Sequence, residues 1–102
     1  MNNADKRIIY EKLKSSNVSN ERIFYEALEA CGDLKNYMDY MTTEPIDCNQ
    51  ELLRLPTADY ELCCALLTML LREDHFCEGS FEKRFRHGEV TPIIDRIISL
   101  LS

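Results

Sequence analysis

The chain has 102 residues, of which 45% are hydrophobic and 29% are charged, and it contains only three glycines and three prolines. A chain of this length forms one domain, and its composition excludes a disordered or a collagen-like protein. Twelve basic residues against eighteen acidic ones give a formal net charge of −6. This charge disfavours nucleic acid and anionic membrane surfaces as partners, because both repel an acidic protein.

Nearly every segment carries apolar residues at helical spacing, and none shows the alternation or the β-branched run of a strand. We therefore predict an all-α protein that forms a single domain over residues 1–102. Its architecture is expected to be a compact bundle of five to seven short helices packed at orthogonal or irregular angles. The predicted helices cover residues 4–14, 20–30, 34–41, 49–53, 58–72, 81–87 and 92–101.

The first two predicted helices are defined by an apolar stripe and by caps. The apolar residues of the helix 4–14 lie on one stripe, Ile8, Ile9 and Leu13. Ser19 or Asn20 is a suitable N-cap for the second helix, and Gly32 stands where a left-handed C-cap would follow it. Both ends of the second helix are therefore well marked.

A cap and a proline define the segment that follows. Asp33 can cap a third helix over 34–41. Pro45 lacks an amide proton and disfavours helical angles at the residue before it, so 44–49 is predicted to be a loop. The aromatic and methionine residues of the third helix fit core packing, which we favour, or an adaptable partner groove, and they are Tyr37, Met38, Tyr40 and Met41.

The helix 58–72 is predicted to be the centre of the bundle, with Thr57 as its N-cap. It is apolar on nearly every face, and such a helix is stable in water only when other helices or a second subunit cover it. Its apolar residues are Leu62, Cys63, Cys64, Ala65, Leu66, Leu67, Met69, Leu70 and Leu71.

The C-terminal part is predicted to be a bend and two helices. Residues 73–79 are polar and end at a glycine, which favours a bend. Ser80 is the predicted N-cap of the helix 81–87. Thr91 is the predicted N-cap of the last helix, where Pro92 fits the first helical position because its missing amide has no partner there.

The cysteines indicate a reducing compartment. There are five of them, an odd number, and the N-terminus lacks the charged and apolar regions of a signal peptide. We expect reduced thiols and a cytoplasmic protein. The longest uncharged apolar stretch, 62–71, is about half of the ~20 residues that a membrane-spanning helix needs, so no membrane association is predicted.

A spaced set of residues lies between positions 58 and 98, namely Leu66, Leu67, Thr68, Arg72, Asp74, Phe76, Gly79, Phe81, Phe85, Gly88, Arg96 and Ile97. This pattern resembles an uncharacterised family of bacterial helical domains of unknown function, and residues 1–57 carry no part of the resemblance. The resemblance implies a small helical, cytoplasmic bacterial protein. It implies no chemistry.

The predicted bend holds a cluster of polar and ionisable residues, Arg72, Glu73, Asp74, His75 and Cys77. In the structural interpretation, which we favour, Arg72 closes the helix C-terminus, Asp74 accepts backbone amides and Phe76 inserts into the core. In the functional interpretation, Arg72 binds an anion in a bidentate manner through two of its guanidinium N–H groups, while Asp74 and His75 transfer a proton. These three residues are the candidate ligand-binding site.

Other chemistries lack support in the sequence. No Cys-x₂-Cys pair or His pair at helical spacing suits zinc, and no activated nucleophile or glycine-rich phosphate loop is present, so no catalytic residue, metal or cofactor is predicted. The one locally basic run is Lys83, Arg84, Arg86 and His87. Because Glu78, Glu82 and Glu89 flank this run, we interpret it as a solvent-exposed face of mixed charge and not as a surface that binds the phosphates of a nucleic acid.

Together these observations favour a protein–protein interaction module or a homodimer without catalysis. The surface is acidic, and so small a chain has more apolar helix faces than it can cover alone. The partner is then another protein or a second copy of the chain. The rival hypothesis is a small enzyme or anion-binding protein that uses Arg72, Asp74 and His75, so the sequence leaves open whether the protein is an enzyme.

Overall fold

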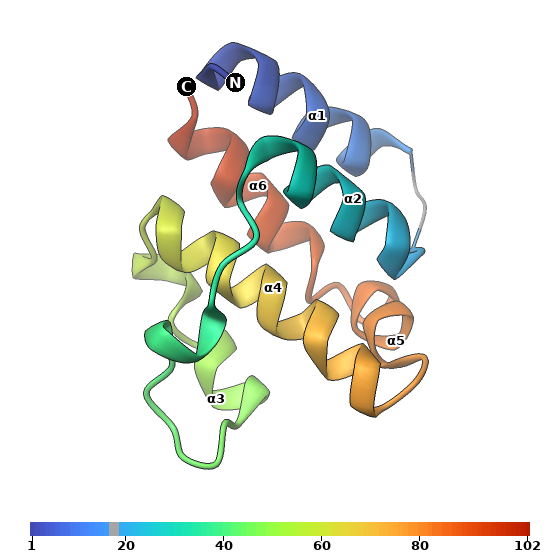
Figure 1. Cartoon of the computed structure of the whole chain (residues 1–102), viewed down its shortest axis with the longest axis vertical. Helices are drawn as coiled ribbons and strands as arrows, with labels where there is room; N and C mark the ends of the chain where they lie inside the picture. Colours follow the sequence, from blue (N-terminus) through green and yellow to red (C-terminus); the bar gives the residue numbers. More distant parts are fainter. Residues whose placement is uncertain (17–18) are drawn as a thin grey trace.

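The computed structural model describes residues 1–16 and 19–102, and within them it contains six α-helices, two 3₁₀ helices and no strand (Figure 1). The helices are α1 (Asn3–Ser15), α2 (Glu21–Cys31), η1 (Tyr37–Tyr40), α3 (Cys48–Leu52), η2 (Leu55–Thr57), α4 (Tyr60–Phe76), α5 (Ser80–Arg86) and α6 (Thr91–Leu100). The prediction of an all-α fold is confirmed.

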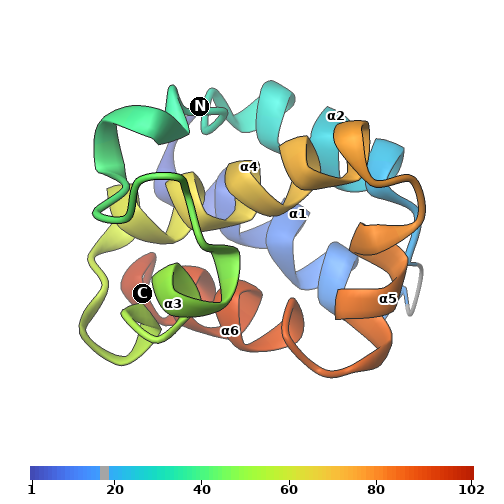
Figure 2. The ribbon, with the colours of Figure 1, turned by 90° about the horizontal axis from the view of Figure 1, so that it is seen from below.

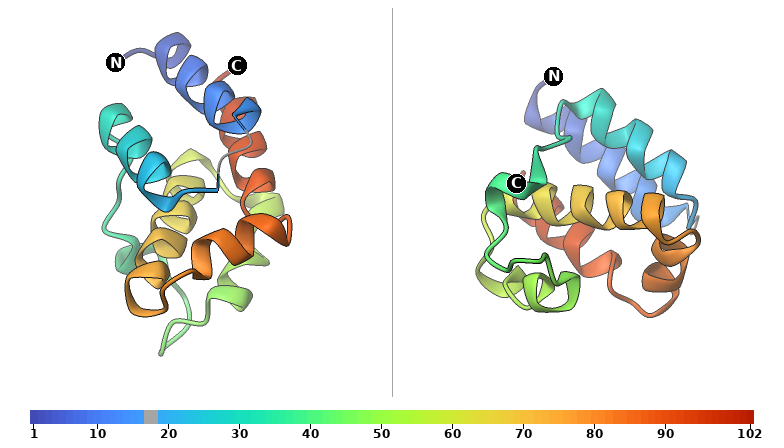
Figure 3. Two further views of the ribbon diagram at one scale, coloured as in Figure 1. Left: turned by 90° about the vertical axis from the view of Figure 1, so that its right-hand side faces the viewer. Right: turned by 60° about the horizontal axis from the view of Figure 1, so that its bottom comes forward.

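α4 is the central helix, and every residue from Cys63 to Leu71 along it is buried. It contacts α2, α3, α5, α6 and η1. Figure 3 shows it crossing between the pair formed by α1 and α2 and the opposite corner that holds α3. The predicted central helix is confirmed, because a helix that is apolar all round is covered here by its neighbours on every side.

α4 begins two residues later than predicted. Asp59 is its N-cap and accepts a hydrogen bond from the Leu62 amide at 2.8 Å. The predicted cap, Thr57, instead ends the 3₁₀ helix η2. The short helix predicted at 49–53 is confirmed as α3, which begins at Cys48 after an Asp47 N-cap.

α4 also ends later than predicted, at Phe76 instead of position 72. The predicted bend over 73–79 is therefore wrong for its first four residues, and only 77–79 separate α4 from α5. Polar residues do not end the helix here because Glu73 and Asp74 find partners in the segment that follows.

The N-terminal helices lie side by side and cover one side of the core together with α6 (Figure 1). The predicted caps of α2 are confirmed: the Asn20 side chain accepts a hydrogen bond from the Arg22 amide at 2.8 Å, and Gly32 adopts φ 70°. The predicted stripe of α1 is wrong at Ile8, which is exposed, whereas Tyr10 is fully buried.

The helix predicted at 34–41 is wrong, because only η1 forms in this segment. Asp33, its predicted N-cap, is 2% exposed and points into the protein. Its carboxylate accepts hydrogen bonds from the Tyr10 hydroxyl at 2.6 Å and from the Tyr60 hydroxyl. It also forms an ion pair with Lys6 Nζ at 3.3 Å. The Asp33 carboxylate therefore joins the α2–η1 connection to α1 and α4.

A second contact keeps this connection extended. The Lys35 amide donates to Thr68 Oγ1 on α4 at 3.3 Å, so it takes part in a tertiary hydrogen bond. Tyr37 and Met41 pack against the core, as the favoured interpretation expected, whereas Met38 is 62% exposed. The segment follows the surface of α4 and cannot coil into a regular helix while these contacts hold.

Two N-cap predictions in the C-terminal part are off by one residue. Ser80 is the first residue of α5 and Gly79, at φ 88°, precedes it, while Thr91 is the first residue of α6 and Val90 precedes it. Pro92 lies in the first turn of α6, as predicted. None of the described helices has both the length and the apolar character to cross a membrane.

The buried Asp33 contacts predict a stability difference between two conservative substitutions. Tyr10→Phe removes a hydrogen bond to a buried carboxylate and should lower the free energy of unfolding by about 2 kcal/mol in urea denaturation. The matched control is Tyr25→Phe, in which the substituted ring is 39% exposed and has no hydroxyl partner among the described residues. This control should stay within about 0.5 kcal/mol of the wild type. Equal effects of the two substitutions would contradict the role given to Asp33.

Candidate functional site

An open pocket of about 390 Å³ lies between α2 and the C-terminal half of α4. These two elements are adjacent in Figure 2, and they contact each other. The pocket is lined by Glu21, Arg22 and Tyr25 of α2 and by Thr68, Leu71, Arg72, Asp74 and His75 of α4. The three residues of the sequence-predicted site therefore all lie at this one pocket.

Helical spacing explains the α4 side of the pocket. Thr68, Leu71, Arg72 and His75 are related by three, four and seven residues, so they lie on one face of α4. Thr68 and Leu71 are 4% and 8% exposed, whereas Arg72 and His75 are exposed. The pocket consequently has a buried base formed by Thr68 and Leu71 and a charged outer edge.

Arg72 is an exposed arginine within α4 and not at its C-terminus. The predicted role in closing the helix is therefore wrong, because one further turn follows it. No hydrogen bond or ion pair to Arg72 is present among the described residues. The neighbouring Arg22 pairs with Glu26 at 3.6 Å, and both of these side chains are largely exposed.

Asp74 holds the connection between α4 and α5. Its Oδ1 accepts hydrogen bonds from the Gly79 amide at 3.1 Å and from the Phe81 amide at 3.0 Å. This arrangement agrees with the structural interpretation, in which Asp74 accepts backbone amides. One oxygen of the carboxylate is thus already occupied by the backbone of this chain.

His75, Phe76 and Cys77 are exposed. Phe76 is 86% exposed, so the prediction that it inserts into the core is wrong. The added turn of α4 carries this ring to the outside, where it lies edge-on to the His75 ring with 6.0 Å between the centroids. A large apolar side chain is therefore presented beside the pocket.

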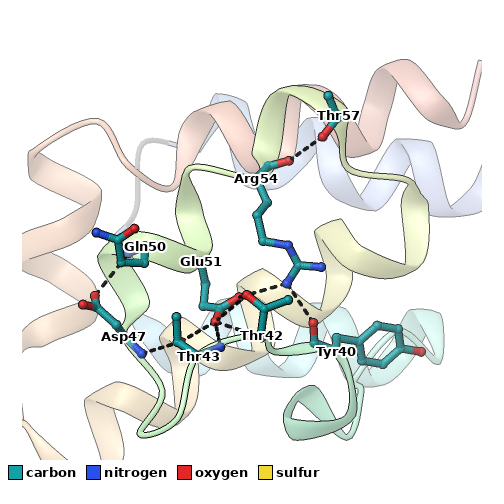
Figure 4. Close-up of polar contacts among 8 residues, drawn as sticks. All are labelled: Tyr40, Thr42, Thr43, Asp47, Gln50, Glu51, Arg54 and Thr57. Carbon is teal, nitrogen blue, oxygen red and sulfur yellow. Dashed lines mark hydrogen bonds and ion pairs between the residues drawn. The ribbon is translucent and has the colours of Figure 1, made fainter.

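Glu51 on α3 is a second buried carboxylate (Figure 4). The amino-acid sequence around it did not predict that it holds another segment of the fold. It is fully buried and accepts hydrogen bonds from the amides of Thr42 and Thr43 at 3.0 and 2.8 Å. Arg54 Nη1 donates to Glu51 at 2.9 Å and to the Tyr40 carbonyl at 2.8 Å. Glu51 thus fixes the loop between η1 and α3.

The surroundings of Glu51 favour its ionised form. Burial by itself raises the pKa of this carboxyl, but hydrogen bonds from Thr43 and Arg54 outweigh burial and lower the pKa from 4.5 to about 2. The folded protein therefore binds this proton more weakly than the unfolded chain does. The resulting stability is present above pH 4.5 and is lost as the pH falls towards 2.

Arg84 is the hub of a third polar cluster. It is 14% exposed and donates Nε and Nη2 to the two carboxylate oxygens of Glu73 at 2.5 and 2.8 Å. Its Nη1 donates to Glu89 at 2.8 Å and to Asn49 Oδ1 at 3.0 Å. The interpretation of the basic run as a solvated face is therefore wrong for Arg84, although Arg86 is exposed and pairs with Glu82.

Sequence reasoning missed the roles of Asp33, Glu51 and Arg84 because most of their partners belong to other segments of the fold, which the sequence does not place beside them. The only local signal was the i,i+3 spacing of Glu51 and Arg54. All three clusters join separate elements of the fold, and their main hydrogen-bonding groups are satisfied within the chain. They consequently carry structural roles.

The cysteines are free, and most of them are shielded. Burial raises the pKa of the Cys48 and Cys63 thiols to about 11 and that of Cys64 to about 12, so these thiols are protonated at neutral pH and are poor nucleophiles. Within residues 1–16 and 19–102, no group of three or more His, Cys, Asp and Glu side chains is arranged to hold a metal ion.

The fold and this site define a small all-α protein with an open surface pocket and structural polar clusters. The chain belongs to the family described as "Family of unknown function (DUF6508)", whose model matches residues 2–102. The resemblance to a family of unknown function is confirmed, but its expected extent of 58–98 is wrong, because the match also includes the N-terminal half. The comparisons with curated proteins and with solved structures find no match.

The contacts of Asp74 predict different effects for two substitutions. Asp74→Ala removes the acceptor of the Gly79 and Phe81 amides and should lower the free energy of unfolding by about 1 kcal/mol. Asp74→Asn keeps an oxygen that can accept the same amides, so most of the stability should be retained. Urea denaturation measures both values. Equal losses for the two variants would show that the amide contacts are not what makes Asp74 important.

The lowered pKa of Glu51 predicts a pH-dependent stability difference. Glu51→Gln should lower the free energy of unfolding by up to about 3 kcal/mol at pH 7. The difference from the wild type should shrink as the pH falls from 4.5 to 2, because the wild-type carboxylate then becomes protonated as well. Denaturant titrations at several pH values measure this dependence. The control is Glu44→Gln, at an exposed position of the same loop, which should change stability by less than about 0.5 kcal/mol.

Proposed function

We propose that the protein is an interaction module that binds a protein partner on the face formed by α2 and α4 and performs no catalysis itself. This surface, the α2/α4 face, consists of Arg22, Tyr25, Arg72, His75 and Phe76. The observation that carries the proposal is the 86% exposure of Phe76 beside a pocket lined by two arginines and a tyrosine.

The composition of the α2/α4 face supports this role. Aromatic residues and arginine are enriched at protein interfaces and dominate their binding energy, because they bury a large area and offer directed hydrogen bonds. Other exposed apolar side chains, such as Leu53 and Met38, lie on separate elements of the fold. Single exposed apolar residues are normal on protein surfaces, whereas a group beside a pocket favours recognition.

The partner can be another protein or a second copy of the chain, and the cytoplasm is the proposed location because five free cysteines suit a reducing compartment. Nucleic acid is not proposed as a partner. The net charge is −6, and Arg84 and Arg86 of the basic run pair with glutamates. Light scattering separates the two kinds of protein partner, since the monomer mass is 11.9 kDa.

A second candidate function is a small enzyme or anion-binding protein that uses the pocket lined by Arg72, Asp74 and His75, in which Arg72 would bind the anion. Two carboxylates, those of Glu21 and Asp74, line the same pocket and oppose an anion. Titration of the isotope-labelled protein with sodium phosphate tests this alternative. Saturable shifts confined to the pocket would favour the anion site over the interaction module.

Phe76→Ser separates a folding role from a binding role. Because the ring is almost fully exposed, the free energy of unfolding should change by less than about 0.5 kcal/mol. Binding to a partner captured from the native host and then purified should weaken by about tenfold or more, as expected for an aromatic anchor. Isothermal titration calorimetry measures the affinity of the purified pair.

The matched control for this experiment is Leu53→Ser, which removes another exposed apolar side chain on a different surface. The control should bind the partner as the wild type does. A partner that binds wild type, Phe76→Ser and Leu53→Ser equally well would show that the α2/α4 face is not its docking surface.

A further inference from the structure

The arginines differ in whether they contact an acceptor within the chain. Six of the seven arginines contact an acceptor within the chain: Arg7, Arg22, Arg54, Arg84 and Arg86 pair with carboxylates, and Arg96 Nε donates to the Ala58 carbonyl. Arg72 is the exception among the described residues, although it lines a pocket. Its planar guanidinium is therefore available for an external acceptor.

A second cation at the pocket, Arg22, forms only a weak ion pair within the chain. Arg22 and Glu26 are separated by 3.6 Å, and their side chains are 82% and 66% exposed. Exposed pairs of this kind contribute little free energy, so a carboxylate of a partner can replace Glu26 at small cost. The pocket therefore offers two guanidinium groups, one from each helix.

The negative groups of the pocket limit the charge of the ligand. Glu21 and Asp74 also line it, and Asp74 already accepts the Gly79 and Phe81 amides. These carboxylates repel a polyanion such as nucleic acid. A single carboxylate directed at Arg72 avoids most of this repulsion.

The apolar part of the pocket lies next to the arginines. Leu71 is 8% exposed at its base, and Tyr25 is 39% exposed at its side. Phe76 follows Arg72 by one helical turn and lies outside the pocket beside His75. The surface thus combines a carboxylate-binding group with an adjoining apolar area.

We propose that the α2/α4 face recognises a short segment of a partner protein in which an aspartate or glutamate neighbours an aromatic or aliphatic residue. The carboxylate pairs with Arg72, in the bidentate geometry that arginine favours, and the apolar side chain contacts Tyr25 and Leu71. This inference rests on the proposed function, because it names the chemistry of the partner at the same face.

The test uses the full chain and a phage-displayed library of random dodecamer peptides. Peptides selected on the immobilised protein should be enriched in Asp or Glu next to a large apolar residue. A selected peptide is then synthesised with a fluorescent label, and its affinity is measured by anisotropy. Replacing its acidic residue by the matching amide should weaken binding by about tenfold or more.

Variants of the protein locate the contact. Arg72→Gln should weaken peptide binding by a similar factor, and Tyr25→Ala should weaken it as well because Tyr25 lines the pocket, while circular dichroism shows an unchanged fold. The charge-matched control is Lys12→Gln, because Lys12 is exposed on α1 and lines none of the pocket. This control should bind the peptide as the wild type does.

Three results would overturn the inference. The first is that the selected peptides lack acidic residues and bind the Arg72→Gln variant as tightly as the wild type. This result would reject carboxylate recognition but would not contradict the proposed interaction module. Displacement of the peptide by inorganic phosphate would identify a general anion site. An absence of any enriched sequence would also reject peptide recognition, whereas docking of a folded partner is judged separately by Phe76→Ser.

Discussion

The enclosure of α4 is the constraint on which the rest of the structure depends. A helix whose residues 63–71 are all buried must be covered on every side, and a chain of 102 residues has few elements with which to cover it. α2, α3, α5, α6 and η1 all contact it. Only the two ends of α4 reach the surface, and its C-terminal end supplies the candidate site.

Two buried carboxylates, those of Asp33 and Glu51, hold the non-helical connections of the chain against the core. Segments that run beside a core without helical hydrogen bonds leave polar groups that need partners. Asp33 supplies an acceptor that joins the α2–η1 connection to α1 and α4, and Glu51 does the same for the loop before α3. Such charges are stable in the interior because several donors surround each of them.

The parts of the fold that were predictable are those that local chemistry decides. The caps of α2 follow from Asn20 and Gly32, and the central position of α4 follows from its apolar residues. The prediction failed where a tertiary partner outweighed a local preference. Asp33 has the residue type of an N-cap, yet tyrosines of two other helices bind its carboxylate and η1 remains a single short turn.

The candidate site was predictable only on its α4 side. Arg72, Asp74 and His75 are close in the sequence, so their clustering could be read from it. Arg22 and Tyr25 are some fifty residues away, and no local pattern places them at the same pocket. The exposure of Phe76 also escaped prediction, since it depends on the last turn of α4, which Glu73 and Asp74 stabilise through contacts with α5.

The uneven shielding of the thiols has a practical consequence for work with the purified protein. Cys31, Cys63 and Cys64 are buried, whereas Cys77 is exposed and directly follows Phe76. Air oxidation in the absence of a reductant will therefore link two molecules through Cys77 first. Such a covalent dimer would imitate natural self-association in any measurement of mass, so the oligomeric state has to be measured with a reductant present.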